Sequence, residues 1–115
     1  MRVMSEAETK EDTEPYAEGT VLTQVFGNHA EPKILAALLS EPDQDLNVTQ
    51  IAELAGVSRK TVYEHLDRFV ELGLVEQTRE VAGSKMYVVD TEDDAAEKLA
   101  EFEWEIIDRV AELRE

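Results

Sequence analysis

The sequence has 115 residues and a formal net charge of −16, from 27 acidic and 11 basic side chains. This length suits one domain, or one small domain with an appended helix. The chain contains no cysteine, which excludes a disulfide framework, a thiolate metal site and a cysteine nucleophile. Its longest apolar run is far shorter than the ~20 residues of a membrane span, and its first residues lack the pattern of a signal peptide. We therefore expect a cytoplasmic protein without membrane partners.

The acidic surplus extends into the part of the chain that is expected to fold. Residues 89–115 alone carry 11 acids and three bases. Such charge repels itself in dilute buffer and is screened by concentrated salt, so we expect a halophilic protein in a high-salt cytoplasm. Residues 57–88, by contrast, hold five bases and five acids. A neutral segment is expected where a surface approaches phosphate, although a core-rich segment would also carry less charge.

The first half of the chain predicts short helices. Residues 1–18 are rich in Glu, Thr and Asp and are expected to form a disordered acidic tail. Apolar spacing predicts a helix over 20–27 and a second helix over 28–39. The first of these would place four apolar side chains on one side: Val21, Leu22, Val25 and Phe26. Residues 46–48 predict a single edge strand, and Thr49 is the expected N-cap of the helix that follows.

A pair of helices joined by a tight turn is predicted next. Gly56 ends the first helix, and Ser58 is the expected N-cap of a longer helix that stops at Gly73. Four apolar side chains of the longer helix are expected to face inward: Val62, Leu66, Phe69 and Val70. Its outer face carries Lys60, Tyr63, Glu64 and Asp67.

Two runs rich in β-forming residues follow, LVEQTREV and KMYVVD, separated by Ala82, Gly83 and Ser84. They predict an antiparallel hairpin. A final helix is expected from Thr91 to the C-terminus, with acidic residues in its first turn, where they suit the helix dipole.

The final helix carries two neighbouring apolar stripes that are interrupted mainly by Glu103. One stripe comprises Ala95, Leu99, Phe102, Ile106, Val110 and Leu113, and the other comprises Ala96, Ala100, Trp104, Ile107 and Ala111. One stripe suffices to cover its own domain, so we expect the other to meet the same helix of a second chain. The alternative is a helix covered wholly by its own domain and by residues 20–27. The expected dimer interface comprises Ala96, Leu99, Ala100, Phe102, Trp104, Ile106, Ile107, Val110 and Ala111.

Residues 29–90 resemble a winged helix-turn-helix domain of archaeal and bacterial transcription regulators. The resemblance rests on six positions that set the crossing and turn of the two helices: Ile51, Ala52, Gly56, Val57, Val62 and Leu66. The phrases FGNHAEPKILAALL and TVYEHLDRFVELGLVE also resemble regulators of haloarchaeal type. The resemblance implies a mainly α fold with a small β-hairpin wing (α+β). Its organisation would be an acidic tail (1–18), a winged helix-turn-helix domain (19–90) and a dimerisation helix (91–115).

The resemblance further implies a sequence-specific transcriptional regulator that binds double-stranded DNA as a homodimer, without a cofactor or a metal. In such domains the second helix of the motif enters the major groove, and the wing tracks the backbone. Glu64 and Asp67 would repel phosphate there, unless they accept from cytosine or are offset by salt cations. The implied DNA-facing residues are Ser58, Arg59, Lys60, Thr61, Tyr63, Glu64, Asp67, Arg79 and Lys85.

Two other classes of function are compatible with a winged helix or with a chain of this size. Some winged helices bind proteins instead of DNA, and the neutral segment is the feature that favours DNA. An enzyme is not expected, because the sequence has no glycine-rich phosphate loop after a strand and no nucleophile-and-base arrangement. The two histidines, His29 and His65, are interpreted as local hydrogen-bonding residues.

Overall fold

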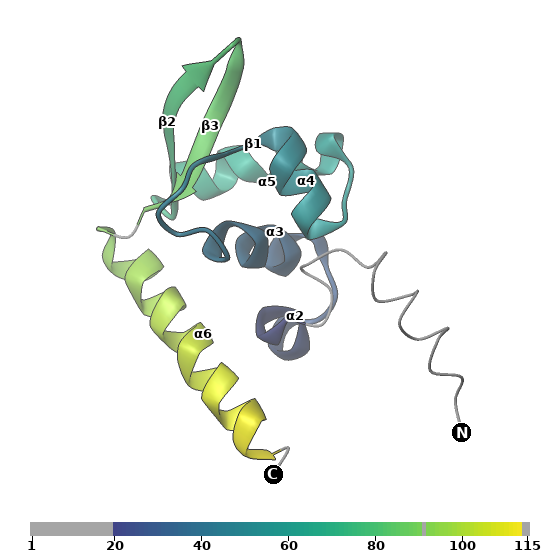
Figure 1. The fold of residues 1–115 in the computed structure, drawn as a ribbon, viewed down its shortest axis with the longest axis vertical. Coiled ribbons are helices and arrows are strands. Elements are labelled where there is room, and N and C mark those ends of the chain that lie inside the picture. The colour runs from purple at the N-terminus through teal and green to yellow at the C-terminus, as the bar shows by residue number, and fades with distance from the viewer. Residues whose placement is uncertain (1–19, 91, 114–115) are drawn as a thin grey trace, which may run out of the picture.

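A computed structural model describes residues 20–90 and 92–113 and shows five helices and three strands in these ranges (Figure 1). The expected tail, residues 1–18, and Thr91 lie outside them. The order of elements is that of a winged helix, which confirms the predicted α+β fold. The elements are α2 (Val21–Phe26), α3 (Ala30–Leu39), β1 (Leu46–Asn47), α4 (Val48–Ala55), α5 (Arg59–Glu71), β2 (Val75–Val81), β3 (Ser84–Val89) and α6 (Asp94–Leu113).

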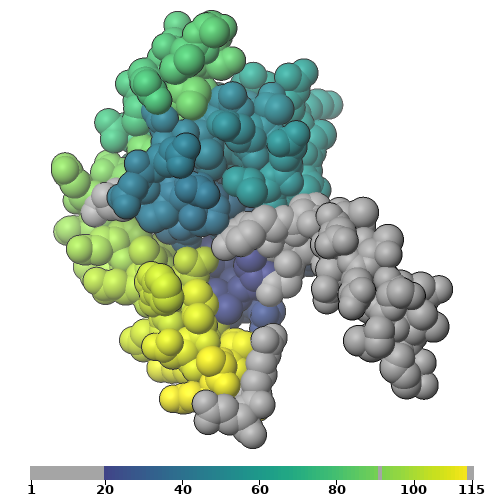
Figure 2. Space-filling view, viewed as in Figure 1, coloured from purple at the N-terminus to yellow at the C-terminus, as the bar shows by residue number. Residues whose placement is uncertain are grey.

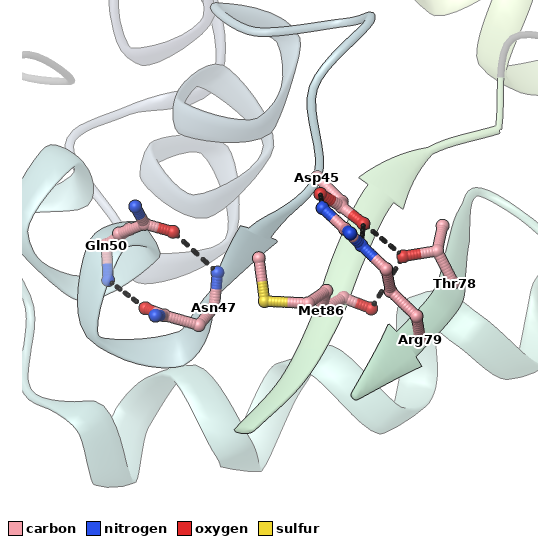
Figure 3. Close-up of polar contacts among 6 residues, drawn as sticks. All are labelled: Asp45, Asn47, Gln50, Thr78, Arg79 and Met86. Carbon is pink, nitrogen blue, oxygen red and sulfur yellow. Dashed lines mark hydrogen bonds and ion pairs between the residues drawn. The ribbon is translucent and has the colours of Figure 1, made fainter. Parts of the chain in front are cut away.

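Helix α4 begins with a reciprocal cap. The Gln50 N–H donates to Asn47 Oδ1 at 2.8 Å, and the Asn47 N–H donates to Gln50 Oε1 at 2.9 Å (Figure 3). The N-cap is therefore Asn47, and the prediction of Thr49 is wrong. The reason is local, since this capping box needs Gln or Glu three residues after the cap, and Gln50 stands there.

The turn between α4 and α5 forms as predicted. Gly56 adopts the left-handed conformation, with φ of 75°, which suits glycine because it has no Cβ. Ser58 then caps α5, and its Oγ accepts from the Thr61 N–H at 3.1 Å. These two positions fix the angle at which α5 leaves α4.

The main core lies between α3, α4, α5 and the sheet. Its most deeply buried large side chains are Ile34, Leu38, Ile51, Val62 and Leu66. Val70 is 37% exposed, so its predicted inward position is wrong. Consecutive residues of a helix are rotated by about 100°, which turns Val70 away from the face that its neighbour Phe69 shares with Leu66.

The wing is a three-stranded antiparallel sheet in the order β1-β3-β2. Ala82 and Gly83 form a two-residue turn with φ values of 52° and 84°, so Ser84 already belongs to β3. Of the seven residues of β2, only Val75 is buried. An irregularity between Gln77 and Arg79 leaves Thr78 without a partner in the register, which is the arrangement of a β-bulge.

Helix α6 begins at Asp94, later than the predicted start, because the Asp93 carboxylate accepts from the Ala96 N–H at 3.0 Å and caps it. Ala96 of α6 packs in a second apolar cluster with Leu22, Ala36, Leu39 and Val89. Leu99 and Ala100, from different predicted stripes, both pack there. Figure 2 shows α6, in yellow, beside α2, in purple. Half-buried positions continue along the same face in the second half of the helix, at Glu103, Ile106 and Val110. One face of α6 is thus turned toward its own domain, and the apolar side chains of Phe102, Trp104 and Ile107 remain exposed.

Helix α2 lies beside α6 at the end of the molecule opposite the wing (Figure 1). The Phe26 and Phe102 rings are 6.0 Å apart between centroids. Val25 and Phe26 are 45% and 54% exposed, so they do not share the buried side of Leu22 as predicted. None of the five helices described combines the length and apolar character that crossing a bilayer requires.

Candidate nucleic-acid interface

The exposed side of α5 and the wing enclose a groove of about 360 Å³. Among the residues predicted to face DNA, the groove brings together Arg59, Tyr63, Asp67 and Lys85. Six further residues line the groove that were not predicted to face DNA: Asn47, Val48, Thr49, Gly83, Ser84 and Tyr87. These residues come from the start of α4, the wing tip and β3.

The outer edge of the groove continues onto a flatter surface of α5. Lys60 and Glu64 line this surface together with Arg59 and Tyr63. Tyr63 is 59% exposed, so its ring is available for contact with a ligand. The spacing of these residues by three and four positions explains why one side of the helix presents all of them.

Two of the predicted contact residues have a local role at the start of α5. The Ser58 and Thr61 hydroxyl oxygens are 3.0 Å apart, and Ser58 also accepts the Thr61 backbone N–H. Thr61 is half-buried, whereas Ser58 is exposed. Both side chains hold the first turn of the helix that carries Arg59 and Lys60.

Arg59 is the residue that links the two helices across the groove. Its Nη1 lies 3.5 Å from the Thr49 hydroxyl oxygen, at the outer limit of a hydrogen bond. Thr49 lies in the first turn of α4, where backbone N–H groups are free of helical partners. A guanidinium and a helix start that meet at one place form a surface suited to an anionic group.

Arg79 lies apart from this groove. Its Nε donates to Asp45 Oδ2 at 2.9 Å and its Nη2 donates to Asp45 Oδ1 at 3.2 Å, and Thr78 Oγ1 donates to the same carboxylate (Figure 3). These hydrogen bonds, that of Arg79 first, lower the pKa of Asp45 to about 2. Asp45 raises the pKa of Arg79 in turn. The structure thus separates Arg79 from the other predicted contact residues.

Tyr87 forms the floor of the groove and belongs to the main core. Burial raises the pKa of its hydroxyl, and the neighbouring Asp67 carboxylate and Tyr63 add to this effect. The hydroxyl therefore stays neutral at physiological pH, and the ring belongs to the same core cluster as the buried side chains of α5.

The neutral segment is exposed and not rich in core residues. Only six of its 32 side chains are buried: Val62, Leu66 and Phe69 of α5, Val75 of β2, and Met86 and Tyr87 of β3. Burial therefore does not explain why its net charge is zero, which was the alternative interpretation of the sequence. Within the described ranges, no group of three or more His, Asp or Glu side chains could hold a metal ion. His65 lies 3.6 Å from Glu31 of α3, away from the groove.

Residues 33–77 match the family described as "Bacterial regulatory protein, arsR family". This segment runs from α3 through the helix-turn-helix into β2 and covers less than half of the chain. No curated protein matches the sequence significantly.

Solved structures that resemble this one include the following three. The AntR antimony-specific transcriptional repressor aligns with a TM-score of 0.58 and 20% identity, over 80% of this chain and 78% of that chain. A predicted DNA-binding transcriptional regulator from E. coli gives 0.53 and 14%, over 90% and 96%. Sso10a-2, a DNA-binding protein from Sulfolobus solfataricus, gives 0.50 and 17%, over 71% and 85%.

At these identities the likeness to solved structures shows the fold, which is the predicted winged helix. The matched family and these neighbours are regulators or DNA-binding proteins, which is a non-enzymatic role. The prediction that the chain is not an enzyme is confirmed.

Proposed function

We propose that this protein is a sequence-specific transcriptional regulator that binds double-stranded DNA with α5 and the wing. Helix α5 lies in the major groove, with Arg59 and Lys60 directed to base edges or phosphate and Tyr63, Glu64 and Asp67 beside them. Ser58 and Thr61 hold the start of this helix, and Lys85 contacts the backbone from the wing. The remaining predicted contact, Arg79, reaches phosphate only if it leaves Asp45.

The observation that carries the proposal is the exposed, charge-balanced surface of residues 57–88 in a protein of net charge −16. A neutral surface is repelled less by a polyanion than an acidic surface is, and three bases around the groove add attraction to phosphate. The match of residues 33–77 to a regulator family supports the same function.

We propose further that this regulator is of haloarchaeal type and acts as a homodimer in a high-salt cytoplasm. Ala96 is 1% exposed and so has no surface left for a second chain. The exposed apolar side chains of α6, Phe102, Trp104 and Ile107, with the adjoining Phe26 of α2, form the surface that we assign to the dimer. Salt cations beside Glu64 and Asp67 would reduce their repulsion of phosphate.

The test is fluorescence anisotropy with labelled genomic promoter fragments in molar KCl. Arg59→Ala and Lys60→Ala should each weaken binding by ~1 to 3 kcal/mol if the side chain reads a base. Arg68→Ala is the matched control, because Arg68 is an exposed base of the same helix that pairs with Glu71 at 3.4 Å and lines neither the groove nor the adjoining surface. It should leave the affinity unchanged.

Two outcomes would contradict the proposal in different ways. If Arg59→Ala and Lys60→Ala leave a measured affinity unchanged, the assigned face is wrong. If the unaltered protein binds no genomic fragment, the winged helix is a protein-interaction module, which is the alternative function.

A further inference from the structure

The wing is tied to the rest of the domain at both of its long strands. Strand β3 pairs with β1, where Leu46 lies opposite Tyr87. Strand β2 lies at the sheet edge, and its separate connection is the Asp45 carboxylate, which accepts from Arg79 and Thr78. Asp45 immediately precedes β1, so one short segment holds both strands (Figure 3).

The β-bulge at Thr78 makes this second connection possible. Val75 faces the core, and in a regular strand Arg79, four residues later, would face the same side. The extra residue reverses the alternation, so Arg79 pairs with Met86 and lies on the side opposite Tyr87 and the groove. Arg79 and Thr78 then reach Asp45 together.

The segment that holds the wing also leads directly into the helix-turn-helix. Asn47, two residues after Asp45, caps α4 through its reciprocal bonds with Gln50. A rotation of the wing relative to α5 must therefore break either the Asp45 contacts or the β1–β3 pairing. The Asp45 side chain is only 13% exposed, whereas the Arg79 side chain is 63% exposed, so the carboxylate is the fixed partner.

We infer that Asp45 and Arg79 are positioning residues, which set the angle of the wing and thereby place Lys85 against the DNA backbone. Arg79 acts through its fork of two hydrogen bonds to Asp45 and makes no phosphate contact. This inference rests on the proposed DNA-binding function and deepens it. Thr78 has an accessory role, because its hydroxyl donates a further hydrogen bond to the Asp45 carboxylate.

The test compares four variants by DNA anisotropy in molar KCl and as a function of salt. Arg79→Lys is the decisive one, because lysine keeps the positive charge but cannot form the two-pronged contact. We expect Arg79→Ala, Arg79→Lys and Asp45→Asn to weaken binding by a similar factor, about three- to tenfold, as for a residue that orients one phosphate contact. The double variant Asp45→Asn/Arg79→Ala should be no weaker than either single variant.

Asp43→Asn is the matched control, since it removes one charge from the same loop, and no hydrogen bond or ion pair to the wing is found for Asp43 among the described residues. Hydrogen exchange should show faster exchange of the β2 and β3 amides in the Asp45 and Arg79 variants, with α5 unchanged. The slope of affinity against salt should be the same for Arg79→Ala and the unaltered protein, because no phosphate contact is lost.

Other results would overturn the inference. If Arg79→Lys binds normally, or if Asp45→Asn binds more tightly than Asp43→Asn, Arg79 is a phosphate contact that Asp45 restrains. If the unaltered protein binds DNA and none of these variants differs from it, the contact between Asp45 and Arg79 has no part in DNA binding. An unaltered protein that binds no DNA refutes the proposed function instead.

Discussion

Ala82 holds a backbone conformation that residues with a Cβ seldom adopt. Its φ of 52° and the φ of 84° at Gly83 form the turn of the wing, for which Asn-Gly is the preferred pair. We expect Ala82→Asn to stabilise the hairpin by about 0.5 to 1 kcal/mol, because asparagine tolerates this region better than alanine. Hydrogen exchange of the β2 and β3 amides is the measurement.

Gly83→Ala is the opposite control at the same turn. A Cβ there would meet no heavy atom within 4 Å, so the variant tests backbone strain alone. It should speed exchange in the wing, and equal exchange in all three proteins would show that the turn conformation does not limit hairpin stability.

Glu103 lies near the middle of the inner face of α6, between Ala96, Ala100 and Val110 of the same helix. Burial raises the pKa of its carboxyl above the ordinary value. The folded chain then binds this proton more tightly than the unfolded chain, so stability falls as pH rises through the window between the two pKa values. The ionised carboxylate destabilises the fold at neutral pH.

Glu103→Gln should therefore raise the melting temperature at pH 7, and its advantage should shrink as the pH is lowered below the folded pKa. Glu105→Gln is the control, because Glu105 is exposed and pairs with Arg109 at 3.5 Å. Thermal melts by circular dichroism from pH 4 to pH 8 compare the three proteins. An equal or lower melting temperature for Glu103→Gln at pH 7 contradicts the assignment.

Among the elements, those with local signals could be predicted from the sequence. The Gly56 turn, the Ser58 cap and the apolar period of α5 lie within a few residues of one another, and they specify the helix-turn-helix without knowledge of the rest of the chain. The position of Arg79 could not be predicted in this way. It depends on a bulge that arises because Val75 must face the core while the Ala82-Gly83 turn fixes the register from the other end.

The division of α6 likewise depends on a distant element. Its apolar face is broad along its whole length, and the sequence does not say how much of it α2 covers. In the structure, the short helix α2 reaches Phe102 but leaves Trp104 66% exposed. The exposed apolar side chains Phe102, Trp104 and Ile107 remain for a partner.

We expect these exposed side chains, with the adjoining side of α2, to form the homodimer in molar KCl. Trp104→Glu should give a monomer by light scattering, because a charge would enter an apolar contact. Glu112→Lys is the control, since it makes a larger change of charge on the polar side of α6, about two turns from Trp104. If the unaltered protein is already monomeric in molar KCl, the dimer is wrong.

In the whole molecule, the net charge is unevenly distributed along the chain. The segment 57–88 is neutral, so all sixteen net negative charges lie elsewhere in the chain. Their mutual repulsion is screened within ~3 Å at molar ionic strength but persists in dilute buffer. Removing KCl should therefore lower the helicity and the melting temperature measured by circular dichroism. Equal melting temperatures in dilute buffer and in molar KCl would exclude a salt requirement.

The same division of charge determines how DNA binding should respond to salt. A dimer should bind two half-sites about one helical turn, ~34 Å, apart. Each phosphate that a base neutralises normally gives a slope of about −0.9 in log affinity against log salt. Here, cations taken up beside Glu64 and Asp67 offset those released by Arg59, Lys60 and Lys85, so we expect a shallow or inverted slope.

The double variant Glu64→Gln/Asp67→Asn tests whether cation uptake causes the shallow slope, because it removes the two carboxylates and keeps all three bases. Its slope should become steeper and negative, toward about −0.9 for each phosphate contact, as for an ordinary DNA-binding protein. Anisotropy titrations from 0.5 M to 3 M KCl would measure both slopes, above the salt range where unfolding interferes. A steep slope in the unaltered protein, or an identical slope in the variant, would show that cation uptake at this face does not occur.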